Sequence, residues 1–267
     1  MAKARSASTN EALGRLRIYA PAMDDPWNWL AAGWRDMWRY PALSLGYGAA
    51  FVAIGLIFTA GLWAINLESL VPALSAGFML VCPILAIGLY EMSRRFERGE
   101  PVIFRDILAV RPAAPVQLAY LAFTLMFIYL VWLRLATLNY ALFSYGDHTP
   151  WFEFVRFALT TPAGLAMVVL GTAIGAVLAF IVFALSAVAV PILLRHDVDA
   201  FTAMAVSARL VMNNPGPMLL WAWLIAVLIA AGIATLFMGL IVVFPLVGHA
   251  TWHAYRTVIE DDGVSAR

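Results

Sequence analysis

The feature that most constrains this chain is a series of long apolar blocks that contain almost no charge. Residues 43–65, for example, include no Asp, Glu, Lys or Arg. About 20 such residues in a helix are long enough to cross the hydrocarbon core of a bilayer. The composition agrees, because 63% of residues are hydrophobic and 12% charged, where soluble proteins are roughly half apolar and a quarter charged. We therefore expect lipid to surround most of the chain.

Six transmembrane helices are expected from these blocks. The first four cover about residues 43–65, 70–92, 114–136 and 164–194. The apolar stretch before Arg256 is long enough for two more, with a turn around Ala231 to Thr235. Residues 1–25 are predicted to be a mobile cytoplasmic tail, 26–256 the transmembrane domain, and 257–267 a short cytoplasmic tail.

Two amphipathic stretches precede two of these helices and are expected to lie in the membrane interface. In the first, aromatic residues recur at helical spacing and arginines lie elsewhere around the axis, the pattern of a helix lying on a membrane. In the second, 198–213, one face is expected to be apolar, and Asp197 is expected to cap the first turn. The first face comprises Trp27, Leu30, Trp34, Met37 and Trp38, and the second Val198, Phe201, Met204, Ala205, Ala208, Val211 and Met212.

Prolines divide the chain into three similar units. Each unit has a surface helix, a proline break, a helix, an outer turn, and a second helix with an internal proline. The breaks fall at Pro41, Pro112 and Pro215, and the internal prolines are Pro83, Pro191 and Pro245. The predicted fold is an all-α polytopic membrane helix bundle of three hairpin-like repeats.

The distribution of positive charge predicts the orientation. Placing both tails and the connections after the second and fourth helices on one side leaves only Arg134 and Arg156, of 17 Lys and Arg residues, on the other. Positive charge marks the cytoplasmic side. We therefore expect both termini in the cytoplasm. The net charge of +1 does not suggest nucleic acid binding.

Each internal proline leaves one backbone carbonyl, four residues earlier, without its usual donor. In lipid such a carbonyl needs another partner. The prolines either produce kinks that shape the bundle, or they line a cavity that binds a cation or polar cargo. The three carbonyls are those of Met79, Ala187 and Ile241.

A weak metal hypothesis rests on polar residues near the cytoplasmic rim. Glu91, Asp199 and His253 each follow an internal proline by eight residues, so in a true repeat they would lie at similar depth and could form a metal site or proton relay. His249 and His253 also share a helix face and could ligate zinc or one side of a haem. Charged groups where helices leave the membrane, and interfacial hydrogen bonding by the histidines, are the alternatives.

Arg134 lies in an otherwise apolar helix, where charge is costly and often functional. Its long stem could instead reach the outer surface and form an ion pair there. Gly171 and Gly175 form a GxxxG pattern that favours close helix packing, inside the bundle or across a dimer. No phosphate loop, GxSxG or HExxH motif is present, so neither enzymatic activity nor a cofactor is expected.

Two blocks resemble the bacterial integral membrane family described as domain of unknown function 2189. They are Cys82-Pro83-Ile84-Leu85-Ala86-Ile87-Gly88-Leu89-Tyr90-Glu91-Met92-Ser93-Arg94-Arg95 and the segment from Gly239 to Arg256. Asn214-Pro215 and Trp34-Arg35-Asp36 also resemble its pattern. Cys82 stands where the family pattern suggests a glycine. The resemblance implies a multi-pass inner-membrane protein and supplies no activity or catalytic residues.

The preferred function is a non-enzymatic accessory or scaffold of a membrane assembly, with an aromatic and arginine-rich cytoplasmic surface as its docking face. The alternatives are a small transporter or channel with a polar path near the three prolines, and a metal- or haem-binding membrane protein. The expected partners are the lipid bilayer and a membrane protein or second copy of the chain.

Overall fold

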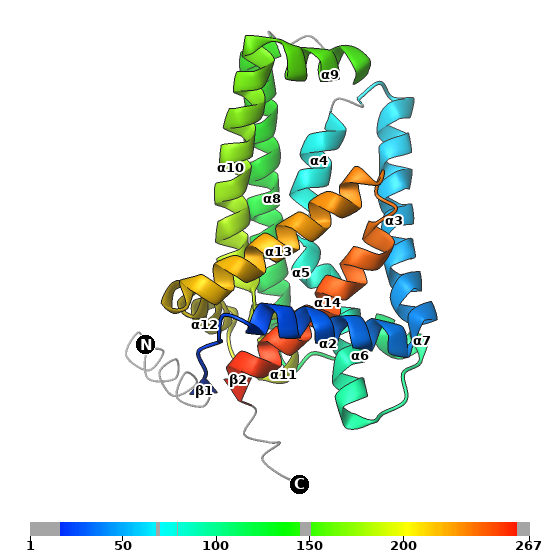
Figure 1. Ribbon diagram of the computed structural model, residues 1–267, viewed down its shortest axis with the longest axis vertical. Coiled ribbons are helices and arrows are strands. Elements are labelled where there is room, and N and C mark those ends of the chain that lie inside the picture. The colour runs from blue at the N-terminus through cyan, green and yellow to red at the C-terminus, as the bar shows by residue number, and fades with distance from the viewer. Residues whose placement is uncertain (1–16, 68–69, 79, 145–150, 261–267) are drawn as a thin grey trace. The chain divides into compact units, whose positions relative to one another are not determined.

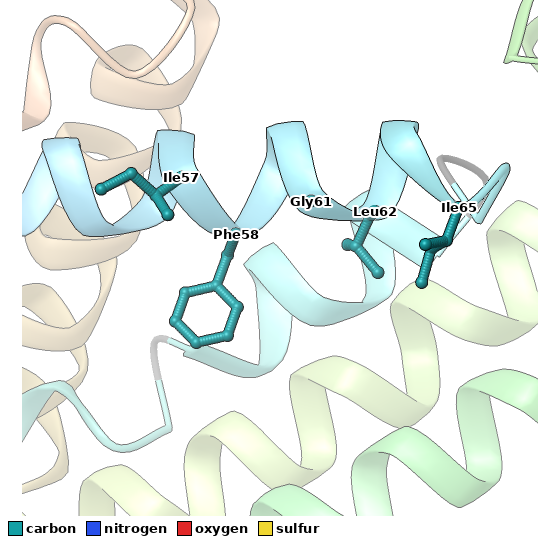
Figure 2. A pocket seen from close by; sticks show the side chains of 5 residues that line it. All are labelled: Ile57, Phe58, Gly61, Leu62 and Ile65. Atoms are coloured by element: carbon teal, nitrogen blue, oxygen red, sulfur yellow. The ribbon is translucent and has the colours of Figure 1, made fainter.

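The computed structural model describes residues 17–67, 70–78, 80–144 and 151–260 (Figure 1). Most of both expected tails and the Met79 carbonyl lie outside these residues. The described chain is all-α apart from two short strands, and it divides into two compact units. Unit 1 comprises Met1–Ala50, Pro83–Leu121 and Phe183–Arg267, and unit 2 comprises Phe51–Cys82 and Ala122–Val182.

Unit 1 is built from surface helices packed on helices of the apolar blocks. Strand β1 (Arg17–Ile18) pairs antiparallel with β2 (Ile259–Glu260), so segments near both ends of the chain lie together. The unit's helices are α2 (Asp25–Arg39), the start of α3 (Pro41–Ala64), most of α5 (Cys82–Leu85), α6 (Ile87–Arg98), α7 (Phe104–Leu108), the start of α8 (Pro115–Ser144), the end of α10 (Pro162–Ser186), α11 (Ala189–Arg195), α12 (Ala200–Asn213), α13 (Pro215–Ala234) and α14 (Leu240–Val258).

Unit 2 contains the rest of α3, α8 and α10, together with α4 (Val71–Phe78) and α9 (Trp151–Thr160). The GxxxG glycines pack inside this unit, as the sequence favoured. A Cβ on Gly171 would lie 2.9 Å from Asn139 Nδ2, and one on Gly175 would lie 3.1 Å from the Trp132 ring. Trp132 also donates from Nε1 to the Ala73 carbonyl of α4 over 2.7 Å. Small residues on α10 thus let the large side chains of α8 approach it closely.

Four helical segments of the described chain are long and apolar enough to cross a bilayer: Pro41–Ala64, Pro115–Ser144, Pro162–Arg195 and Pro215–Ala234. The expected second span is divided into α4, α5 and α6. The expected sixth span corresponds to α14, whose second half carries two histidines and Arg256. The six-span count and the three-fold repeat are not confirmed and stay predictions.

The three internal prolines have different local effects. α10 ends at Ser186 and α11 begins at Ala189, so the helix is interrupted just before Pro191. At Pro83 the chain forms only the four-residue α5. α14, in contrast, continues through Pro245. The carbonyl of Ile241, which Pro245 deprives of a donor, faces α3: a Cβ on Gly48 would lie 2.2 Å from this oxygen.

The surface helices form where expected. Within the apolar face expected on α12, Val211 is buried, while Met204, Ala205 and Ala208 are half-buried. Phe201 and Met212 of that face are 74% and 75% exposed, while Ala203, Val206 and Leu210 are buried. The expectation for the cap was wrong: Asp199, not Asp197, is the N-cap of α12, and its side chain accepts from the Thr202 N–H over 2.9 Å. Asp199 lies directly before the first helical residue, where a carboxylate reaches the free N–H groups.

Candidate functional site

Close packing of α2, α6 and α14 in unit 1 creates the site. α2 and α14 form the most extensive helix pair of the described chain. They approach closely because Gly33 has no side chain: a Cβ there would lie 2.6 Å from the Ala250 backbone nitrogen. Gly248 of α14 similarly admits Leu89 of α6, whose Cδ1 would lie 2.5 Å from an added Cβ. Two glycines therefore bring three helices together around His249.

A buried hydrogen-bond network joins these helices to α3. His249 lies between two serines, with Nε2 3.1 Å from Ser44 Oγ and Nδ1 2.8 Å from Ser93 Oγ. Ser93 donates to Asp36 Oδ2 over 2.7 Å. His253, one turn beyond His249, places Nε2 2.8 Å from the same Asp36 oxygen. We call these five residues the Asp36 network.

The chemistry of the groups assigns the direction of the hydrogen bonds. An ionised carboxylate only accepts, so the single Ser93 hydroxyl proton points to Asp36 and Ser93 Oγ accepts from His249 Nδ1–H. A neutral imidazole protonated at Nδ1 accepts at Nε2, so Ser44 donates to it. His253 Nε2–H donates to Asp36. Each member thus has a compatible partner, and the network has one consistent arrangement.

Asp36 is the anionic centre of this network. Burial by itself raises the pKa of the Asp36 carboxyl, but hydrogen bonds from His253 and Ser93 and the positive potential of the histidines outweigh burial. The net effect lowers the pKa of Asp36 below its ordinary value of 3.8. Hydrogen bonds to the charged form of a group favour that form. Asp36 is therefore a carboxylate at neutral pH although only 7% of its surface is exposed.

The network contains groups that hydrolytic enzymes also use: a serine hydroxyl hydrogen-bonded to a histidine ring, and a carboxylate hydrogen-bonded to the same serine. A nucleophile and its base must, however, reach a substrate. Ser44, Ser93 and His249 have 0% exposed surface. Phe96 stacks beside the His249 ring, and Arg39 lies over Phe96 and donates to its carbonyl. The arrangement can therefore fix four helices relative to one another, which is what a satisfied buried polar network does.

Ion pairs hold the segment that follows Ser93. Glu91 accepts from Arg94 and Arg95, with an Arg95 Nε to Glu91 Oε1 distance of 3.0 Å. Arg95 also pairs with Asp106 of α7 at 2.8 Å and donates to the Pro101 carbonyl. Burial raises the pKa of Glu91, but its hydrogen bonds to the two arginines lower it by more. Arg95, held by Glu91, thus anchors the connection between α6 and α7.

The four residues of the metal hypothesis are placed in three separate local arrangements. Glu91 pairs with arginines, Asp199 caps α12 and also accepts from the Thr202 hydroxyl, and the two histidines belong to the Asp36 network. In the described part of the chain, no group of three or more His, Cys, Asp or Glu side chains is arranged to hold a metal ion. The metal site stays a prediction, and it would require these side chains to leave their present partners.

Of the remaining predicted residues, Arg134 is exposed on α8 of unit 2. Pro83 and Pro191 lie in short helices that follow interruptions, and Pro245 is buried in α14. The sequence reasoning identified the histidine pair but missed its partners Asp36, Ser44 and Ser93. Asp36 and Ser93 lie in blocks that resemble the family pattern, but that resemblance assigns them no role, and a serine or aspartate in a helix is too common to single out.

The fold and site are those of a helical integral membrane protein whose surface helices are fixed by a buried polar network. Residues 70–195, just under half of the chain, match the model of a family described as "Predicted integral membrane protein (DUF2189)". The resemblance seen in the sequence is thereby confirmed over these residues. Of the Asp36 network, Ser93 lies inside the matched range. No curated protein and no solved structure matches the chain.

Proposed function

We propose that this integral membrane protein is a non-enzymatic accessory or scaffold of a bacterial inner-membrane assembly, with both termini in the cytoplasm. The observation that carries the proposal is the Asp36 network, whose most reactive groups, Ser44, Ser93 and His249, are fully buried. Such a network holds helices in one arrangement and gives a substrate no access. The positive charge of the expected cytoplasmic segments supports the orientation.

The Arg95 contacts to Asp106 and the Pro101 carbonyl hold one surface, the α6–α7 segment (residues 97–105), on α6. Ile103 and Phe104 of this segment are 57% and 64% exposed. Exposed side chains of both charges, including Glu97, Arg98 and Arg105, surround them. An apolar centre with a charged rim is the usual anatomy of a protein–protein interface. We therefore place the docking face for a partner protein on the α6–α7 segment.

The transporter alternative has less support from the packing. A polar path near Pro245 would use the free carbonyl of Ile241, but that oxygen lies against Gly48 of α3 with no room for a methyl group. A closely packed interface at this carbonyl supports a filled helix bundle over a hydrated path there.

The test is co-purification of the full-length protein from its native membranes in mild detergent. We expect a stoichiometric companion with the wild type, reduced at least about tenfold for Ile103→Ser/Phe104→Ser, because the apolar centre of an interface carries most of its affinity. The matched control is Phe152→Ser, which alters an 85% exposed side chain of α9 in unit 2. The proposal fails if the wild type is recovered alone, or if the double variant retains its companion while keeping the wild-type elution volume.

A further inference from the structure

Two surface helices of unit 1, α2 and α12, have the same pattern of burial relative to the proline that follows each of them. α2 leads into α3 at Pro41, and α12 leads into α13 at Pro215 (Figure 1). Counting back from each proline, the residues at distances of 4, 5, 8, 12 and 15 positions are buried in both helices. They are Met37, Asp36, Gly33, Trp29 and Pro26 in α2, and Val211, Leu210, Ser207, Ala203 and Ala200 in α12.

The exposed sides of the two helices also correspond. Large apolar side chains are exposed 3 and 14 positions before the proline: Trp38 and Trp27 in α2, Met212 and Phe201 in α12. At about 100° per residue, these positions fall within roughly 40° of one another around the axis. We call each set the apolar stripe of its helix. Trp34 lies on the α2 stripe and packs edge-on against Trp38, with ring centroids 5.6 Å apart.

An exposed arginine lies beside each stripe, six positions before the proline: Arg35 in α2 and Arg209 in α12. Each arginine is roughly 60–100° around the axis from the side chains of its stripe. An exposed asparagine lies near it in each helix, Asn28 in α2 and Asn213 in α12. Within the described residues, neither guanidinium forms an ion pair with an acidic side chain. Both helices therefore have three sectors: a buried face, an apolar stripe, and a positively charged polar face.

We infer that α2 and α12 are a matched pair of interfacial helices whose apolar stripes enter the bilayer and whose Arg35 and Arg209 bind the phosphate groups of anionic phospholipids. Each helix is joined by a single residue, Tyr40 or Asn214, to a helix that begins at a proline and is apolar enough to span the bilayer, so both lie where hydrocarbon gives way to headgroups. Tryptophan is favoured at that depth. Arginine next to it is positioned for charge-assisted hydrogen bonds to lipid phosphate.

This inference concerns different residues from the proposed protein-docking face, and the two tests separate them. The first experiment reconstitutes the full-length protein in vesicles of equimolar phosphatidylcholine and phosphatidylglycerol. The protein is then repurified in mild detergent, and mass spectrometry measures the ratio of the two retained lipids. We expect enrichment of phosphatidylglycerol, reduced at least about fivefold by Arg35→Gln/Arg209→Gln, the effect expected from even one basic residue at an anionic surface.

The matched control is Arg98→Gln/Arg105→Gln, which removes two exposed arginines from the α6–α7 segment of the same unit. It should keep the enrichment. The inference is overturned if the wild type shows no enrichment, if Arg35→Gln/Arg209→Gln leaves it unchanged, or if the control loses as much. In the last case general positive charge, and not the two helices, attracts the lipid.

The second experiment measures depth and does not depend on lipid identity. Single cysteines carrying a nitroxide label are placed on the stripes, Trp34→Cys and Met212→Cys, and on the polar faces, Asn28→Cys and Asn213→Cys. A Cys82→Ala background removes the only native thiol. In vesicles, the stripe labels should collide more with oxygen, and the polar-face labels more with a water-soluble nickel complex. Equal accessibility at the four positions would show that the helices do not lie in the interface.

Discussion

Replacing Asp36 tests the buried network directly, because two hydrogen bonds end on the same carboxylate oxygen. Ser93 and His253 both donate to Asp36 Oδ2, over 2.7 and 2.8 Å. Asp36→Ala removes this acceptor and leaves both donors without it. A hydrogen bond to a charged group contributes about 1.5–3 kcal/mol, and stranding a buried polar group adds to the loss. We therefore expect Asp36→Ala to lower the free energy of unfolding by about 3–5 kcal/mol.

Asp36→Asn is the matched control because it separates charge from geometry. The amide oxygen can take the place of Oδ2 and accept from both donors, so only the strength of the bonds changes. Neutral hydrogen bonds contribute about half as much as charge-assisted ones, so we expect a loss of about 1–2 kcal/mol. The essential result is that Asp36→Ala lowers the free energy of unfolding more than Asp36→Asn does.

Steric trapping in bicelles, with biotin labels on two helices of unit 1, measures these free energies for the full-length protein. The double variant Asp36→Ala/Ser93→Ala completes a cycle, and its loss should be less than the sum of the two single losses, because both remove the same hydrogen bond. The network does not hold the helices as described if the free energy of unfolding of Asp36→Ala lies within about 1 kcal/mol of the wild-type value. The same conclusion follows if Asp36→Asn and Asp36→Ala lose equal stability.

Three further outcomes follow from the same structure. Gly48→Ala should lower the free energy of unfolding by about 1–3 kcal/mol, because its methyl group would overlap a backbone carbonyl of α14. Gly46→Ala should not lower it, because no atom lies within 4 Å of a Cβ there. Equal melting temperatures of the two variants would contradict this packing. The stability contributed by the lowered pKa of Asp36 is present above the ordinary pKa of 3.8 and is lost as the pH falls through the lower pKa of the folded state. In acid titrations followed by tryptophan fluorescence, Asp36→Asn should lack this loss of stability. Identical titration profiles for the wild type and Asp36→Asn would refute the role given to Asp36. Trp132→Phe, in unit 2, should lower the free energy of unfolding by about 1 kcal/mol, because it removes the donor to the Ala73 carbonyl. Hydrogen exchange should become faster in α4. Unchanged exchange in α4 would show that this hydrogen bond does not stabilise the helix.

Which parts of the structure were predictable depended on the range of the interaction. The surface helices were expected near residues 26–40 and 198–213, and α2 and α12 form there, because helical periodicity and prolines act over a few residues. The sequence did not predict which side of α12 would be buried. Both of its faces carry apolar side chains, and one face packs in unit 1 while Phe201 and Met212 of the other are exposed. Local pattern alone cannot choose between two apolar faces.

The candidate site shows the same limit. The spacing of His249 and His253 correctly placed both on one helix, but the sequence suggested a metal or interfacial role for them. Their partners come from other helices: Ser44 lies 205 residues from His249, and Asp36 lies 217 residues from His253. A serine or aspartate on a helix becomes part of a network only when another helix supplies its partner.

The sequence by itself determined that this is a helical membrane protein, which stretches form its surface helices α2 and α12, and which residues of the GxxxG pattern allow close packing. These conclusions depend on hydrophobicity, helical period and proline chemistry, which are properties of neighbouring residues. The tertiary structure alone decided which face of each surface helix is buried and that Asp36 is the shared acceptor of Ser93 and His253. Those outcomes depend on which distant helices meet, and glycines such as Gly33 and Gly48 permit contacts whose partners no local pattern specifies.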